Sequence, residues 1–182
     1  MNKNKTLGEI TGKFITLLNP ETGAYSVSYG FKKVGEVNMG SEEQPNLVNE
    51  YEYYSSNFDH KPSLAEIKDL VVKHYNNECD KEIVSGCRFE NELVWLSQEN
   101  QFNYKAAFDR ALQKESTLKE GEKNPLLPVI FKVGDEYNPV YKVFNTIDDL
   151  GDFIDLTLNH VLTTLGKYWE IKNNIDWTKY EE

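Results

Sequence analysis

The stretch VWLSQENQFNYKAAFDRA, from Val94 to Ala111, decides how the second part of the chain is interpreted. Its first residues are apolar and indicate a strand, and Ser97 then offers a hydroxyl that can cap a helix. Glu99 falls in the first turn, where the helix dipole favours an acid. An apolar stripe follows at helical spacing, so we expect a strand that passes directly into an amphipathic helix. The stripe consists of Tyr104, Ala107, Phe108, Ala111 and Leu112.

Upstream of this stretch the sequence predicts a helix and a hairpin. Ser63 and Glu66 have the spacing of a capping box, in which the serine caps the helix and the glutamate reaches back to it. Apolar residues then recur at helical spacing, so we expect a helix from about 64 to 80. The segment 83–96 is rich in apolar residues, and we expect a hairpin that turns at Glu90–Glu92.

Downstream, the segment 129–144 predicts another hairpin, and Thr146 caps the longest helix. This helix is apolar around much of its circumference, which indicates that it packs against more than one partner, and it should end near Asn173–Asn174. The order helix, hairpin, helix, hairpin, helix predicts an α+β domain over residues 63–182.

Residues 1–62 have a different character and predict a β-rich N-terminal module. The segments 14–18 and 24–29 flank a turn with proline and glycine, so they predict a β-hairpin, and residues 31–37 can add a third strand. From 39 to 62 no period is visible. Two interpretations stay open for the aromatic part of this segment: a surface linker, or an extended arm that docks into a neighbouring subunit.

Exposed aromatic residues favour contact surfaces, and tyrosine alone contributes 11 residues to this chain. We therefore treat a set of aromatic residues, with one amide, as candidates for an interface. They are Tyr25, Tyr29, Tyr51, Tyr53, Tyr54, Phe58, Trp95 and Asn100.

Composition limits the possible partners. The net charge of −10 repels nucleic-acid phosphates and anionic membranes, so we expect neither as a partner. No apolar run approaches the length of a membrane span, and the N-terminal residues lack the apolar core of a signal peptide. Cys79 and Cys87 have no histidines at zinc-finger spacing, and we expect two free thiols.

A search for catalytic motifs finds no phosphate-binding loop and no nucleophile elbow. His74 and Glu78 have the spacing of a metal pair, but a solvated helix pair is the simpler interpretation. The acids at 148–155 fit the start of a helix. Trp95 is either a sugar-stacking platform or a core or interface aromatic. We expect no enzyme activity, no catalytic residue, no cofactor and no metal.

Residues 81–111 and 127–176 resemble a C-terminal domain of tail-fibre and other tail-associated proteins of tailed phages and prophages, including crAss-like gut phages. Gly86, the segment 94–101 and the closing helix carry the resemblance, which covers about 63–177. The family brings no activity and no catalytic residue with it. Many members join this domain to long fibre segments, whereas this chain has only a short β-rich part.

The resemblance implies a structural protein of a virion, at the tail, the neck or the fibre attachment. An adaptor, ring or connector subunit fits the length of the chain. It would be made in the host cytoplasm, reside in the virion, and contact copies of itself and tail, portal-proximal or fibre proteins. Two alternatives stay open: a carbohydrate-binding module that contacts the host surface, and a tail-fibre assembly chaperone.

Overall fold

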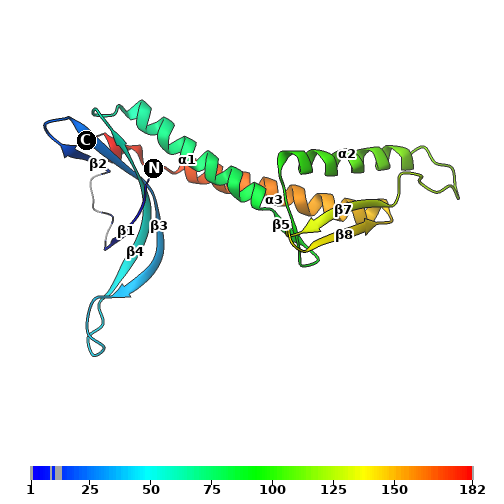
Figure 1. The fold of residues 1–182 in the computed structure, drawn as a ribbon, viewed down its shortest axis with the longest axis horizontal. Helices are drawn as coiled ribbons and strands as arrows, with labels where there is room; N and C mark the ends of the chain where they lie inside the picture. Colours follow the sequence, from blue (N-terminus) through cyan, green and yellow to red (C-terminus); the bar gives the residue numbers. More distant parts are fainter. Residues whose placement is uncertain (1, 9, 11–13, 182) are drawn as a thin grey trace. The chain divides into compact units, whose positions relative to one another are not determined.

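The computed structural model describes residues 2–8, 10 and 14–181, which form a mixed α+β fold (Figure 1). The chain divides into two compact units, one formed by Met1–His74 with Asn174–Glu182 and the other by Tyr75–Asn173. The boundary expected between residues 62 and 63 falls inside the first unit. Within the described residues, no helix is long and apolar enough to cross a membrane.

The first unit is built on an antiparallel sheet whose strands, as far as the described residues show, follow the order β1-β4-β3-β2. The predicted hairpin is confirmed as β2 with the start of β3. Residues 31–37 form no separate strand, because β3 continues through a bulge at Gly30, whose φ of +67° suits glycine. The strands are β1 (Asn2–Leu7), β2 (Ile15–Asn19), β3 (Ala24–Asn38) and β4 (Leu47–Phe58).

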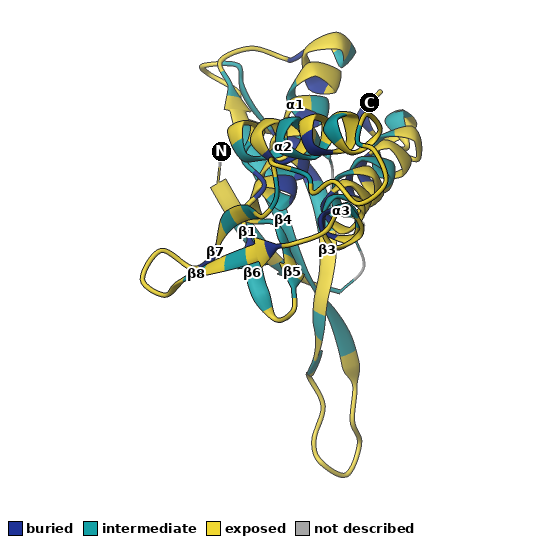
Figure 2. Ribbon diagram, turned by 90° about the vertical axis from the view of Figure 1, so that its right-hand side faces the viewer, coloured by how far each residue is buried: buried dark blue, intermediate teal, exposed yellow. Residues whose placement is uncertain are grey.

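Strand β4 contradicts both interpretations of the 39–62 segment, since Leu47–Phe58 is neither a linker nor a free arm. It lies between β1 and β3 and pairs with β3 along most of its length and with β1 over residues 50–55. Nearly all of its side chains are half-buried, so the alternation of buried and exposed residues that identifies a strand is missing. The loop at the tip of the β3–β4 hairpin is exposed throughout and is yellow in Figure 2.

Strand β1 has no counterpart in the sequence-based prediction. Its residues are almost all polar, and a polar segment carries no strand period. Cross-strand ion pairs stabilise it instead, because Lys3 contacts Glu52 at 2.7 Å and Lys5 contacts Glu50 at 3.1 Å. Lysines on an edge strand also discourage pairing with other chains.

Helix α1 (Leu64–Ser85) begins at the predicted capping box, which is confirmed: Ser63 N donates to Glu66 Oε2, and Glu66 N donates to Ser63 Oγ. The helix is longer than predicted. It ends at Ser85 and is followed by Gly86, whose φ is +81°. The shorter hairpin β5 (Cys87–Phe89) and β6 (Glu92–Val94) turns through Glu90 and Asn91, both with positive φ. The helix belongs to the first unit up to His74.

The rest of the second unit follows the prediction closely. Ser97 caps α2 (Gln98–Glu115), and Thr146 Oγ1 accepts a hydrogen bond from the first turn of α3 (Ile147–Asn173). Strands β7 (Val129–Gly134) and β8 (Pro139–Phe144) form the expected hairpin. The core lies between these elements. Its buried residues are Cys79, Ile83, Val94, Leu96, Tyr104, Ala111, Val133, Phe144, Leu150, Phe153 and Tyr168.

A short 3-10 helix, η1 (Trp177–Tyr180), was not predicted and belongs to the first unit. Asp176 caps it through Thr178. The buried Tyr180 donates its hydroxyl to Ser28 O on β3, and its ring packs edge-on against Phe14. Four residues are too few to show a period in the sequence, so only tertiary contacts identify this element.

Candidate interaction surface

Two of the predicted interface tyrosines lie in a cluster inside the first unit. Tyr29 is fully buried, stacks near Tyr54, and places its hydroxyl 3.0 Å from Ser56 Oγ. Burial raises the pKa of Tyr29. The ring of His74 on α1 lies 4.4 Å from that of Tyr54 and 5.2 Å from that of Tyr29. Tyr29 therefore joins helix to sheet and is unavailable to a partner.

The buried position of His74 overturns the expectation of a solvated pair with Glu78. His74 packs among the tyrosine rings, while Glu78 accepts a salt bridge from Lys81 at 2.7 Å. The bulge glycine makes room for it, because a Cβ on Gly30 would stand 3.2 Å from His74 Nε2. No group of three or more His, Cys, Asp or Glu residues in the described part of the chain could hold a metal ion.

The other aromatic candidates of the first unit are half-buried. Tyr53 stacks on Phe31 with ring centroids 5.0 Å apart. Tyr25 and Phe58 face each other across β3 and β4, and the hydroxyl of Tyr51 lies 3.4 Å from Asn49 Nδ2. These side chains contact their own sheet, so each presents only part of its surface outward.

Trp95 differs from these residues because its side chain points away from the core. Val94 and Leu96 are fully buried on either side, whereas 46% of Trp95 is exposed. Asn100 does not reach outward as a contact residue: its side-chain amide donates to Trp95 O at 3.0 Å, and Gln101 donates to Leu96 O at 2.7 Å. The amides of this stretch therefore fix the backbone that presents the indole.

A second exposed apolar area lies on the β7–β8 hairpin, and it was missed as a site. Ile130 faces Val143 across the strands, and Lys132 faces Tyr141. The three apolar members are 50% to 65% exposed. We call these four residues the outer hairpin face. The opposite face carries Phe131, Val133 and Phe144 to the core, so a sequence signal existed: both faces of this hairpin are apolar.

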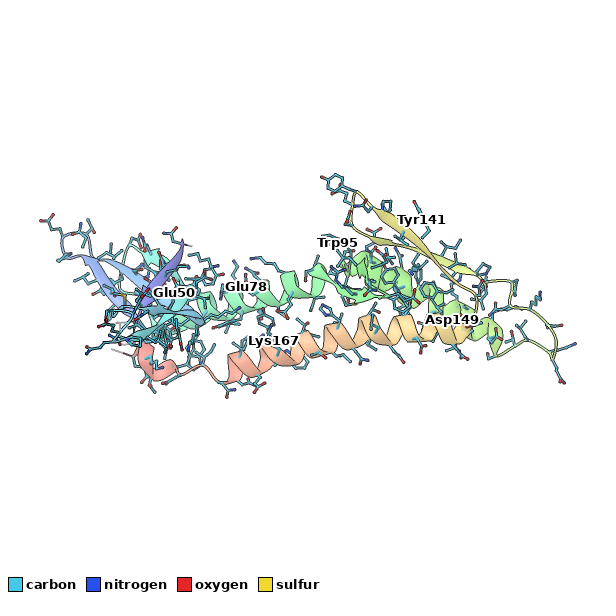
Figure 3. The ribbon with its side chains drawn as sticks, turned by 90° about the horizontal axis from the view of Figure 1, so that it is seen from below. Glu50, Glu78, Trp95, Tyr141, Asp149 and Lys167 are labelled. Atoms are coloured by element: carbon cyan, nitrogen blue, oxygen red, sulfur yellow. The ribbon has the colours of Figure 1, made fainter. Side chains whose placement is uncertain are left out.

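The outer hairpin face and Trp95 together form the candidate interaction surface. Trp95 directly follows β6, and β6 is a neighbour of β7. In Figure 3, Trp95 and Tyr141 both lie on the side of the second unit away from α3. Exposed apolar areas with aromatic members mark contact sites more often than isolated exposed residues do.

A small set of ionisable groups joins α1 to α3 within the second unit. Glu82 on α1 lies 2.6 Å from Lys167 and accepts a hydrogen bond from Tyr168 on α3 at 3.0 Å. The bond from Lys167 lowers the pKa of Glu82, while burial and the bond to Glu82 raise that of Tyr168. His160 is half-buried, with Nε2 3.2 Å from Glu82 O.

Both cysteines are free thiols, as predicted. Burial raises the pKa of Cys79 and that of Cys87, which keeps the thiols protonated and weakens them as nucleophiles. The thiols therefore act as small apolar side chains in and around the core.

Comparison of the chain with family models, with curated proteins and with solved structures finds no match in any of the three.

Proposed function

We propose that this protein is a structural subunit of a tailed-phage virion that works through protein–protein contacts. The observation that supports it best is the candidate interaction surface: Trp95, Ile130, Tyr141 and Val143 expose apolar area to water although the same unit has a well-filled core. An apolar surface of this kind lowers its free energy when a partner covers it.

The virion context comes from the resemblance to tail-associated phage proteins. In this proposal residues 63–182 act as the tail-associated helix–hairpin–helix–hairpin–helix domain, and the candidate interaction surface contacts a tail, portal-proximal or fibre protein. The net charge of −10 keeps nucleic acid and anionic membranes away from the assembly. No residue is assigned a catalytic role.

Mass spectrometry of purified phage particles tests the proposal. We expect peptides of this chain at a stoichiometry comparable with that of other tail or neck proteins. A chain that is abundant in infected cells but missing from the particles is an assembly chaperone instead, and that result contradicts the proposal.

A specific observation also favours carbohydrate binding as a second candidate. Trp95 and Tyr141 are both exposed, and indole and phenol rings are the side chains on which sugar rings stack. This candidate predicts saturable binding on a glycan array that Trp95→Ala abolishes while the circular dichroism spectrum is kept. Leu18→Ala in the first unit, where Leu18 is equally exposed, is the matched control and should leave glycan binding unchanged.

A further inference from the structure

Helix α3 carries two apolar stripes; this chain buries the first and covers the second only in part. The inner stripe is buried: Phe153 contacts the rings of Phe89, Tyr104, Phe131 and Phe144. The second stripe, which we call the outer α3 stripe, runs along a neighbouring face of the same helix. It consists of Ile154, Leu158, Val161, Leu162, Leu165 and Trp169.

About half of the outer α3 stripe is in contact with water. Leu158 is 49% exposed, Leu162 is 52% exposed and Trp169 is 56% exposed. At its N-terminal end the stripe forms one wall of a groove of about 360 Å³, whose other wall is α2. Tyr104 and Phe108 line the α2 side. A helix with two apolar stripes is typical of one that packs against two partners. Here Ile154, Val161 and Leu165 pack against the core, whereas Leu158, Leu162 and Trp169 face water.

The outer α3 stripe is complementary to itself when a second copy runs in the opposite direction. A two-fold axis between Val161 and Leu162 brings Leu158 beside Leu165 of the other copy. The same axis brings Ile154 beside Trp169, so every apolar member meets an apolar member. The stripe is about 22 Å long at the usual rise of an α helix.

The charges along α3 favour this antiparallel arrangement over a parallel one. The first half of the helix carries Asp152 and Asp155, whereas Lys172 lies in the last turn. An antiparallel pair sets the acidic half of one copy beside the half of the other copy that carries Lys167 and Lys172, with Glu170 as the one acid of that half. A parallel pair would put acid against acid, which the net charge of −10 makes costly.

Gly166 adds an independent observation. Glycine inside a helix costs about 1 kcal/mol relative to alanine, and a structural reason is expected where it occurs. Within the described residues no such contact is found: apart from its chain neighbours and the backbone of its own helix, no atom lies within 4 Å of the place where its Cβ would stand. In the antiparallel pair Gly166 lies close to Leu158 of the second copy, where a missing side chain leaves room for a leucine.

We propose that the outer α3 stripe is a self-association surface on which α3 of a second copy packs in the antiparallel direction. This proposal is independent of the virion role, since it concerns copies of this chain alone. A single helix pair of this length buries less than the roughly 800 Å² per partner of a standard interface. The dimer should therefore be weak and should form as the concentration rises.

Sedimentation velocity over a wide concentration range tests the proposal with the full-length protein. Wild type should shift from monomer to dimer. Leu162→Glu, next to the axis, acts twice per dimer and should leave only monomer. The matched control is Leu156→Glu, on the same helix but off the stripe, and it should dimerise like wild type. Wild type that stays monomeric throughout, or Leu162→Glu that dimerises normally, overturns the proposal.

Cysteine cross-linking tests the direction of the two helices and remains informative if the glutamate variant does not fold. Under mild oxidation Leu162→Cys should form a disulfide between copies, because the residue lies beside its own symmetry mate. Trp169→Cys should not, since antiparallel helices hold the two copies of residue 169 far apart. Cross-linking of Trp169→Cys with none for Leu162→Cys contradicts the antiparallel arrangement. Cross-linking of neither variant contradicts the surface itself.

Discussion

The two units of this protein hold their aromatic residues in different ways. In the second unit Phe89, Phe131, Phe144 and Phe153 meet in a dry core that excludes water. In the first unit most tyrosines are half-buried against a sheet, and the hydroxyls of the buried Tyr29 and Tyr180 reach polar partners. The second unit therefore depends mainly on its apolar core. The first unit combines a smaller buried set, Val27, Tyr29, Ile67 and Val71, with cross-strand pairs and tyrosine hydrogen bonds.

The largest expected effect comes from breaking the dry core. Phe153→Ala removes a fully buried ring that contacts four others, and we expect a loss of about 3–5 kcal/mol in the free energy of unfolding. Hydrogen exchange read by mass spectrometry should show faster exchange across the second unit than across the first. Leu156→Ala, which is partly exposed on the same helix, is the control, and an equal loss there contradicts the distinction.

The next effect tests the close packing of the backbone at the end of α1, where Gly86 lies against Val94. Gly86 has φ of +81°, and a Cβ there would collide with the carbonyl oxygen of Val94. Gly86→Ala should cost more than about 2 kcal/mol, because backbone strain and the collision add. Gly121, with φ of +84° and open space around it, is the matched site. Urea denaturation measures the loss of stability in both variants. If Gly121→Ala loses as much stability as Gly86→Ala, the collision with Val94 does not contribute to the loss.

A smaller effect is expected from the first unit. Tyr29→Phe keeps the ring and removes only the hydroxyl that lies 3.0 Å from Ser56 Oγ, so the loss should be about 1 kcal/mol. Thermal unfolding of Tyr29→Phe and of Ser56→Ala, alone and combined, measures this bond as a coupling. Additive losses would show that the two hydroxyls act separately.

The smallest effect is a pH dependence at the start of α1. Hydrogen bonds from Ser63 and His60 lower the pKa of Glu66 to about 2. The contribution of Glu66 to the stability of the fold is therefore fully present above its ordinary pKa near 4.5. Contacts with Asp59 and Glu66 raise the pKa of His60 above its ordinary value of 6.5. The contribution of His60 to stability is therefore complete below pH 6.5 and is lost as pH rises through the raised pKa.

Differences between wild type and two variants, measured over a pH series, test these signs. The stability gap to Glu66→Gln should close as pH falls from about 4.5 to about 2. The gap to His60→Gln should be present below pH 6.5 while Glu66 is ionised, and should close as pH rises through the raised pKa of His60. A gap to His60→Gln that widens with rising pH contradicts the assigned contacts.

Sequence patterns predicted the second unit well because its elements bury one face each. Ser97 and Thr146 cap helices as expected, and the β7–β8 hairpin lies where the period indicates. The first unit escaped prediction because its strands are not amphipathic. Strand β1 is polar and held by ion pairs, and β4 is half-buried on both faces.

The candidate surface was predictable only in part. Successive side chains of a strand point to opposite faces. Because Val94 and Leu96 are buried, Trp95 between them points away from the core. Tyr29 was assigned to an interface because sequence does not distinguish a tyrosine that faces a neighbouring helix from one that faces a partner. The outer α3 stripe appeared only as excess apolar width, and its exposure depends on which elements cover α3.

Incorporation into phage particles tests the central claim most directly. Cells infected with the phage would express a tagged wild-type chain, a tagged Ile130→Lys/Val143→Lys variant, or a tagged Leu18→Lys control, and the tag in purified particles would be quantified. Our account predicts that wild type and the control enter the particles equally and that the hairpin variant, folded by circular dichroism, is excluded. Equal incorporation of the hairpin variant would contradict a contact through this surface.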